Sequence, residues 1–271
     1  MTSRPIVSFA LAILASLVFL PPLQAQRPAT TPPSQPASRR VIADASATVP
    51  ADSATWQGLE WRNVGPANTS GRAADVEGVP GNPNIVYLGS ASGGVWKTTN
   101  GGVTWKPIFD KQQVLSIGDI ALEPGNPEVI YVGTGEGAPR NSISFGNGVY
   151  KSTDGGATWR HLGLTSSERI TRILVSARNP NMVYVGVLGH VFGPNPDRGV
   201  YMSANGGDSW EKVLYIDDMH GVADMDIDPH NPNILYAAMW RFERKPWTHT
   251  SGSEQGGVFR SVDAGKTWKK L

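Results

Sequence analysis

The chain has 271 residues, of which 39% are hydrophobic and 17% charged, so it can bury a core and is not disordered as a whole. Its formal net charge of +1 gives no electrostatic argument for a nucleic-acid partner. The chain has no cysteine, which excludes disulfides, thiolate metal sites and cysteine nucleophiles.

The first predicted element is a secretory signal peptide over residues 1–25. Arg4 precedes an apolar run from Ile6 to Leu20, and the small residue Ala25 stands near a cleavage point. The run is short for a membrane span, although an uncleaved anchor is the alternative. Residues 26–52 are rich in Pro, Ala, Ser and Thr and predict a disordered linker. We therefore expect a secreted or periplasmic protein with no stable membrane span after signal cleavage.

Residues 53–271 contain a repeated unit with a period of about 50 residues, which is typical of propeller blades or a related array. In each unit, a β-branched and aromatic run follows an Asn-Pro pair, then comes a strand that begins with Gly, and then a turn segment that ends in Trp. The four turn segments are TTNGGVTW (98–105), STDGGATW (152–159), SANGGDSW (203–210) and SVDAGKTW (261–268).

Each unit is interpreted as four strands, called a to d, with strand d beginning at the Trp. Four-stranded antiparallel units arranged radially make a β-propeller, so the predicted fold class is all-β. The segment LEWRNVGP (59–66) resembles a strand d, yet it precedes the first strand a. We therefore expect about four blades of a larger propeller, of seven blades or more, that is truncated at its C-terminus. A closed four-bladed ring is the alternative.

The turn segments have a structural explanation. The Asp or Asn at the third position can accept hydrogen bonds from turn amides, the glycines allow a tight hairpin, and the Trp packs beside neighbouring strands. Two of the four residues at the third position are Asn, which suits a turn acceptor better than a general acid or a calcium ligand. This structural role is assigned to Asn100, Trp105, Asp154, Trp159, Asn205, Trp210, Asp263 and Trp268.

The four segments resemble the Asp-box, S-x-D-x-G-x-T-W, also called the BNR repeat. It occurs in sialidases, family 74 xyloglucan hydrolases, sortilin-type receptors and a photosystem II assembly factor. From about Leu59 the chain resembles exported bacterial proteins with sortilin-like or "glycosyl hydrolase" BNR propellers, through phrases such as YVGTGEG, LGHVFGPNPDRGVY and RKPWTHTSG. Family 74 hydrolases place a catalytic Asp where this chain has Ala91, and the sialidase F/Y-R-I-P motif is absent from the mature region. These departures put hydrolysis in doubt.

Two regions carry candidate site residues. Strand a is expected to line a central channel, where Asp75, Asp119 and Asp224 are catalytic candidates; Arg–Asp pairs across the axis are the structural alternative. The long loops between strands b and c are expected on one face, where binding residues gather. Glu136 and His190 lie in these loops, and for each of them a local hydrogen-bonding role is the alternative to a functional one. The ligand-binding candidates are Arg72, Glu136, Arg140, Arg172, His190, Trp240, Arg244 and Trp247.

No metal-spaced cluster, P-loop, zinc-protease motif or G-x-S-x-G appears, so neither a metal nor a cofactor is predicted. The predicted function is that of an exported, sortilin-like module that binds a protein, peptide or glycan on the long-loop face. The alternatives are a glycoside hydrolase of xyloglucanase or sialidase type that acts on polysaccharide, and an assembly scaffold. Ala91 and the scattered carboxylates favour binding over catalysis.

Overall fold

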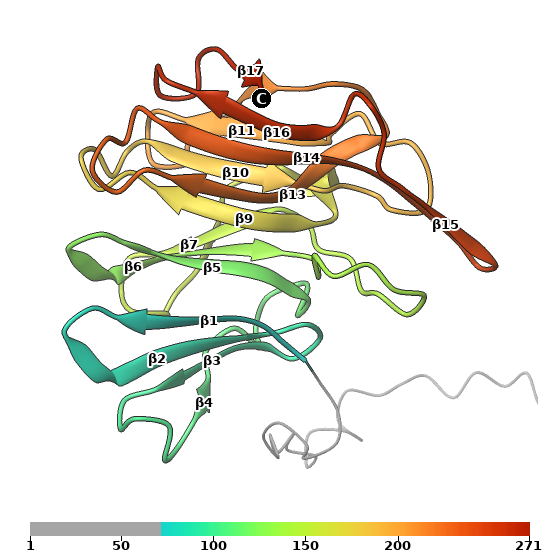
Figure 1. Ribbon diagram of the computed structural model, residues 1–271. Helices are drawn as coiled ribbons and strands as arrows, with labels where there is room; N and C mark the ends of the chain where they lie inside the picture. Colours follow the sequence, from blue (N-terminus) through green and yellow to red (C-terminus); the bar gives the residue numbers. More distant parts are fainter. Residues whose placement is uncertain (1–71) are drawn as a thin grey trace, which may run out of the picture. The chain divides into compact units, whose positions relative to one another are not determined.

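The computed structural model describes residues 72–271, which form four antiparallel β-sheets that follow one another along the chain (Figure 1). Each sheet has four strands hydrogen-bonded in sequence order, and a hairpin strand extends the fourth. The only helix among these residues is the 3-10 turn η1 (Thr165–Ser167). The prediction of an all-β chain of four-stranded antiparallel units is confirmed: the chain forms several blades of a partial β-propeller. The predicted signal peptide, linker and strand at 59–66 lie outside the described residues.

The first sheet contains β1 (Ala73–Val79), β2 (Asn82–Ser90), β3 (Gly94–Thr98) and β4 (Lys106–Pro107). The second contains β5 (Ile117–Glu123), β6 (Asn126–Thr134), β7 (Val149–Ser152) and β8 (Arg160–His161). The third contains β9 (Ile170–Val175), β10 (Val183–Val187), β11 (Gly199–Ser203) and β12 (Glu211–Leu214). The fourth contains β13 (His220–Ile227), β14 (Leu235–Lys245), β15 (Thr248–Ser251), β16 (Gly257–Ser261) and β17 (Lys269–Lys270).

The outer strands are shorter than predicted and begin after the Trp, because the Trp belongs to the turn. The indole of Trp105 donates to the carbonyl of Gly102 inside its own turn, at 3.1 Å. The indoles of Trp159 and Trp210 instead donate to the preceding sheet, at the carbonyls of Ile108 (2.7 Å) and Leu162 (2.8 Å). The residue expected to start strand d therefore closes the turn or joins two sheets.

The first strands β1, β5, β9 and β13 lie next to one another in that order, and apolar layers fill the space between successive sheets. A glycine on the second strand of each of the first three sheets makes room for a β-branched residue of the next sheet. A Cβ at Gly133 would lie 2.4 Å from Ile170. The same contact joins Gly89 to Ile117 and Gly186 to Val222, at 2.8 and 2.7 Å.

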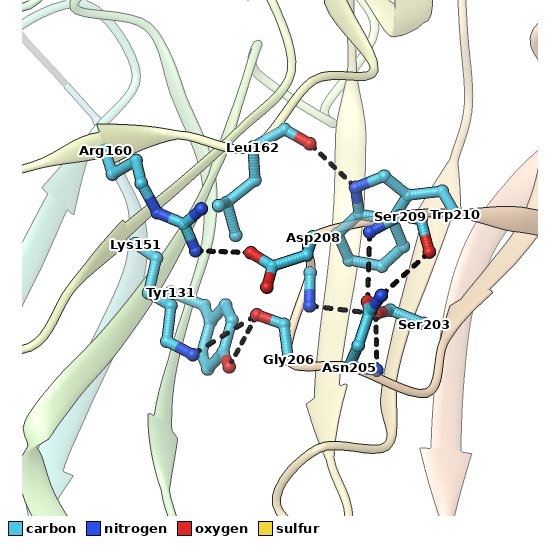
Figure 2. Close-up of polar contacts among 11 residues, drawn as sticks. Tyr131, Lys151, Arg160, Leu162, Ser203, Asn205, Gly206, Asp208, Ser209 and Trp210 are labelled. Carbon is cyan, nitrogen blue, oxygen red and sulfur yellow. Dashed lines mark hydrogen bonds and ion pairs between the residues drawn. The ribbon is translucent and has the colours of Figure 1, made fainter.

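The turn motifs join the sheets by a second repeated contact, shown for the second and third sheets in Figure 2. Tyr131 and Lys151 are paired across β6 and β7, and both donate to the carbonyl of Gly206 in the next turn motif, at 3.2 Å. Arg160 also pairs with Asp208 of that turn at 2.7 Å. The equivalent contacts elsewhere are Lys97 with the Gly155 carbonyl at 2.9 Å and Tyr184 with the Ala264 carbonyl at 2.9 Å.

At the third position of the turn motif, Asp and Asn can replace each other because both form the hydrogen bonds that close the turn. Asp154 accepts the Thr158 amide at 2.8 Å and the Thr158 hydroxyl at 2.6 Å. Asn100 accepts the Thr104 amide through its oxygen at 2.9 Å and donates from its amide group to the Thr104 hydroxyl. Because a hydroxyl can donate or accept, the turn closes with either residue.

The two turn carboxylates predict an acid-dependent loss of stability. The Thr hydroxyl, the Thr amide and the Ser hydroxyl that bond Asp154 and Asp263 hold the pKa of each at about 2. Each carboxylate therefore stabilises the fold fully above the unfolded pKa near 3.8, and this contribution is lost as the pH falls through about 2. Thermal melts between pH 5 and pH 2 should show a smaller fall in Tm for Asp154→Asn/Asp263→Asn than for the unaltered chain. Equal slopes would contradict this role.

Candidate functional site

Four charged residues occupy the same position on the four first strands, forming a column that we call the axial column: Asp75, Asp119, Arg172 and Asp224. Two of its carboxylates join neighbouring sheets through backbone amides. Asp75 accepts the Ile120 amide at 2.9 Å, and Asp119 accepts the Ile173 amide at 2.6 Å. The first two catalytic candidates are therefore each engaged in holding the next sheet.

Arg172 stands between two carboxylates of the axial column. Its guanidinium lies 3.6 Å from Asp119 and 3.4 Å from Asp224, and its Nε also donates to the Met225 carbonyl at 3.3 Å. This is the Arg–Asp pairing considered as the structural alternative. Asp224 also accepts the Met225 amide, and its side chain is largely exposed.

Asp119 is buried, with 3% of its surface exposed. Burial raises its pKa to about 8, and the charge of Asp75 adds to this rise, while the Ile173 amide and Arg172 oppose it. Burial therefore favours the protonated form of the Asp119 carboxyl over the ionised form. A carboxyl with a raised pKa that also accepts a backbone amide is poorly suited to act as an ionised nucleophile or base.

Arg72 and Glu136, both ligand-binding candidates, form a two-pronged ion pair. Arg72 Nε donates to Glu136 Oε1 at 2.7 Å, and Nη2 contacts Oε2. Glu136 is only 2% exposed, and its amide donates to the Ser116 hydroxyl at 3.0 Å. The pair fastens the start of the first sheet to the second, which leaves the carboxylate little capacity for a ligand.

The long connections between the second and third strands of the predicted units come together in sheets two, three and four, and we call their common surface the loop face. In sheet four the expected loop is largely a hairpin, because β14 continues to Lys245 and pairs with β15. Arg244 on β14 donates to the Asn141 side chain at 2.7 Å, and its amide donates to the Val191 carbonyl at 2.6 Å. A small apolar cluster underlies these loops, formed by Leu188, Val191 and Phe242 with Ile143 and Trp240 packed against it. The loop face thus has its own core.

Arg198 anchors the loop face and was not among the predicted site residues. Its side chain is fully buried, at 0% exposure. The guanidinium donates to the carbonyls of His190 and Met219 at 2.5 Å, Phe242 at 3.0 Å and Gly193 at 3.1 Å. Burial lowers its pKa to about 10, which leaves it protonated at neutral pH. In the sequence it looked like an ordinary basic residue of a surface loop.

His220 and Arg169 are two further buried residues that sequence reasoning missed. His220 opens β13 and bridges Asp217 Oδ1 through Nδ1 at 2.7 Å and Ser253 Oγ through Nε2 at 2.5 Å. Arg169 lies just before β9, bonded to Glu168 at 3.0 Å. His220 is the first residue of a first strand and Arg169 directly precedes one, and neither position carries a sequence motif that marks it as buried.

Exposed aromatic side chains surround the loop face. Trp247, at the tip of the hairpin between β14 and β15, is 80% exposed, and Figure 1 shows this hairpin projecting beyond the sheets. Trp240 instead packs against Phe242, with ring centroids 4.3 Å apart, and its indole donates to Ser251. Of the two predicted stacking residues, only Trp247 therefore presents a free ring.

The other predicted loop residues differ in their surroundings. His190 lies 3.1 Å from Glu168 and its ring contacts Phe192 edge-on, so it has the local hydrogen-bonding role considered as the alternative. Arg140 is exposed. Phe145 and Phe192 are exposed aromatic residues that the sequence analysis did not select. Residues 72–271 contain no group of three or more His, Asp or Glu side chains placed to hold a metal ion.

No family model and no curated protein matches the chain. A crystal structure of an ancestral GH74 enzyme is similar, with TM-score 0.57 and 23% identity over 74% of this chain and 25% of that one. A GH74 enzyme from Niastella koreensis has TM-score 0.51 and 25% identity over 70% of this chain and 28% of that one. The chain forms part of a β-propeller.

This partial propeller spans about a quarter of the length of the two enzymes. A more distant likeness, with TM-score 0.40 and 16% identity, is to YCF48 from Cyanidioschyzon merolae, over 76% of this chain and 86% of that one. That likeness is too weak to bear on function. Within the described residues, no helix is long and apolar enough to cross a membrane.

Proposed function

We propose that this propeller is an exported binding module, sortilin-like in that it holds a protein segment or peptide on its loop face. The proposal of export rests on the signal peptide predicted for residues 1–25. The proposal of binding rests on the loop face, where Trp247, Phe145 and Phe192 expose aromatic rings above a separate apolar core. The second long connection also carries the exposed Arg140. Exposed aromatic residues together with a basic residue suit a partner with apolar side chains and some negative charge.

The carboxylates of the axial column are already bound to backbone amides or to Arg172, and this observation favours binding over catalysis as the function. A glycosidase of the usual kind needs two carboxyl groups about 5–10 Å apart across one bond, one acidic and one ionised. Asp75 and Asp119 each accept the amide of the next first strand, and Asp224 is held by Arg172. These carboxyl groups are therefore engaged in contacts that hold neighbouring sheets together, rather than held ready for a substrate.

A glycoside hydrolase is the second candidate, because both similar structures with the higher TM-scores are GH74 enzymes. The position where that family is expected to place a catalytic Asp holds Ala91, which is buried at 1% exposure. A methyl group there can neither donate a proton nor attack a sugar. If this candidate is right, the two carboxyls come from elsewhere in the protein.

Binding and turnover can be measured on the same protein. We expect a peptide array and a polysaccharide panel to show binding that Trp247→Ala weakens at least about tenfold, a typical loss for a central aromatic contact. Val103→Ala is the matched control, because Val103 is also 80% exposed but lies in the first turn motif. Reducing-sugar release that is abolished by Asp119→Asn or Asp224→Asn would reject the binding module in favour of the hydrolase.

A further inference from the structure

A serine, a histidine and an aspartate form a hydrogen-bonded chain at the loop face, separate from the axial column. Ser253 lies in the connection between β15 and β16, and its Oγ is 2.5 Å from His220 Nε2. On the other side of the ring, His220 Nδ1 lies 2.7 Å from Asp217 Oδ1. Enzymes on unrelated folds activate a serine nucleophile through this same order of contacts.

The direction of each hydrogen bond follows from Asp217, because an ionised carboxylate can only accept. Burial acts to raise the pKa of Asp217, but the hydrogen bonds from the His220 ring and the Met219 amide outweigh it and hold the pKa below its usual range. His220 Nδ1 therefore carries the hydrogen donated to Asp217, and Nε2 of the neutral ring is an acceptor. The Ser253 hydroxyl then donates to Nε2, which is the direction that general-base catalysis requires.

Backbone groups hold both ends of this chain of hydrogen bonds. Ser253 Oγ accepts the Gly256 amide at 3.0 Å, which leaves its own hydrogen for His220. Glycine suits position 256, since a Cβ there would lie 2.9 Å from a backbone carbonyl oxygen of β14 and 3.6 Å from His220 Cδ2. Asp217 Oδ1 also accepts the amides of Met219 at 2.8 Å and His220 at 3.0 Å. The imidazole is therefore oriented before a substrate binds.

The neighbours of Ser253 provide access and further donors. Ser253 is half-buried, whereas the His220 side chain behind it is only 2% exposed. Gly252, Glu254 and Gln255 are all exposed, and within the described residues the amides of Glu254 and Gln255 donate to no protein group. The amide that follows a nucleophilic serine is a usual donor to the oxygen that becomes negative during acyl transfer.

We propose that Ser253, His220 and Asp217 form an acyl-transfer site that hydrolyses carboxylic esters. Ser253 Oγ bonds to the ester carbonyl carbon while its proton moves to His220 Nε2. The bond from that carbon to the alcohol oxygen then breaks, and the alcohol leaves with the proton from Nε2. Water attacks the acyl-serine and gives a proton to Nε2, and the carboxylic acid is released as Ser253 regains its hydrogen. An ester is the substrate class because its alcohol needs less help from a general acid than an amine does.

Covalent labelling tests the nucleophile directly. A fluorophosphonate should form a bond between its phosphorus and Ser253 Oγ with loss of fluoride, because His220 takes up the hydroxyl proton. Peptide mapping of the full chain by mass spectrometry should place the adduct on Ser253. Ser251→Ala is the matched control and should label fully, since the Ser251 hydroxyl lies two residues away and accepts the Trp240 indole. A folded chain without this adduct overturns the proposal.

Turnover of p-nitrophenyl acetate gives a second readout. Ser253→Ala and His220→Gln should each lower kcat/KM by at least about a hundredfold, while Ser251→Ala should leave it unchanged. Combining the first two substitutions should lower it little further, because such residues act as a unit. An unchanged rate in a Ser253→Ala chain with the melting temperature of the unaltered chain would show that this network only supports the fold. That outcome rejects the site whether or not the loop face binds a peptide.

Discussion

Replacing Gly118 with alanine should lower the free energy of unfolding by about 3 kcal/mol, at the upper end of overpacking effects. Gly118 is the extra residue of the bulge in β5, where the register with β6 shifts. A Cβ at this position would lie 1.9 Å from the Ile170 carbonyl oxygen and 2.5 Å from that of Gly135. Both are backbone atoms of packed strands, so neither can rotate away, and the second and third sheets would have to separate.

Gly78→Ala is the matched control for that substitution. Gly78 lies on β1, the equivalent first strand of the first sheet, and a Cβ there would meet nothing within 4 Å. Urea unfolding should show a change within about 0.5 kcal/mol for Gly78→Ala, typical of an uncrowded surface position. If the two variants unfold at the same urea concentration, the close approach at Gly118 does not limit stability.

Arg198→Met should cost about 3–5 kcal/mol, the usual loss when one partner of a buried charged network is removed. The methionine keeps most of the side-chain volume but removes the donor from four buried or partly buried carbonyl groups. Those carbonyls belong to the loop that carries His190 and Gly193 and to the fourth sheet. The loop face should therefore loosen first, with faster amide exchange near residue 190 than in the first sheet.

The Arg198→Lys variant tests whether stability at this position depends on the positive charge alone or also on the planar shape of the guanidinium. A lysine retains the positive charge, but its single ammonium group cannot reach acceptors on two sides as a planar guanidinium does. We expect a loss of stability between that of the unaltered chain and that of Arg198→Met, measured by thermal melting. A lysine variant as stable as the unaltered chain would show that charge alone is needed.

The candidate site was predictable only in part. The loop face followed from loop length, because the connections between the second and third strands are the long irregular ones. Arg198 was missed, since its acceptors are backbone carbonyls of the loop itself and of the fourth sheet, which no sequence pattern marks. Glu136 was selected as a possible ligand group, yet Arg72, 64 positions away, engages it.

By itself, the sequence determined the architecture of this protein. The spacing of the Asn-Pro pairs, the Gly-aromatic strands and the turn motifs is local information, because strand alternation and turn conformation depend on adjacent residues. The four-stranded sheets and the equivalence of Asp154 with Asn100 could therefore be inferred from it.

Only the tertiary structure decided how the polar residues of different sheets are used. Asp119 has the same strand position as Asp75 and Asp224, so the sequence repeat alone does not distinguish the three as candidate catalytic residues. Packing buries Asp119 against Ile173 and beside Arg172, and leaves Asp224 exposed on the last sheet. Protonation and free hydrogen-bonding capacity depend on burial and on the neighbouring sheet, which are properties of contacts between residues about 50 positions apart.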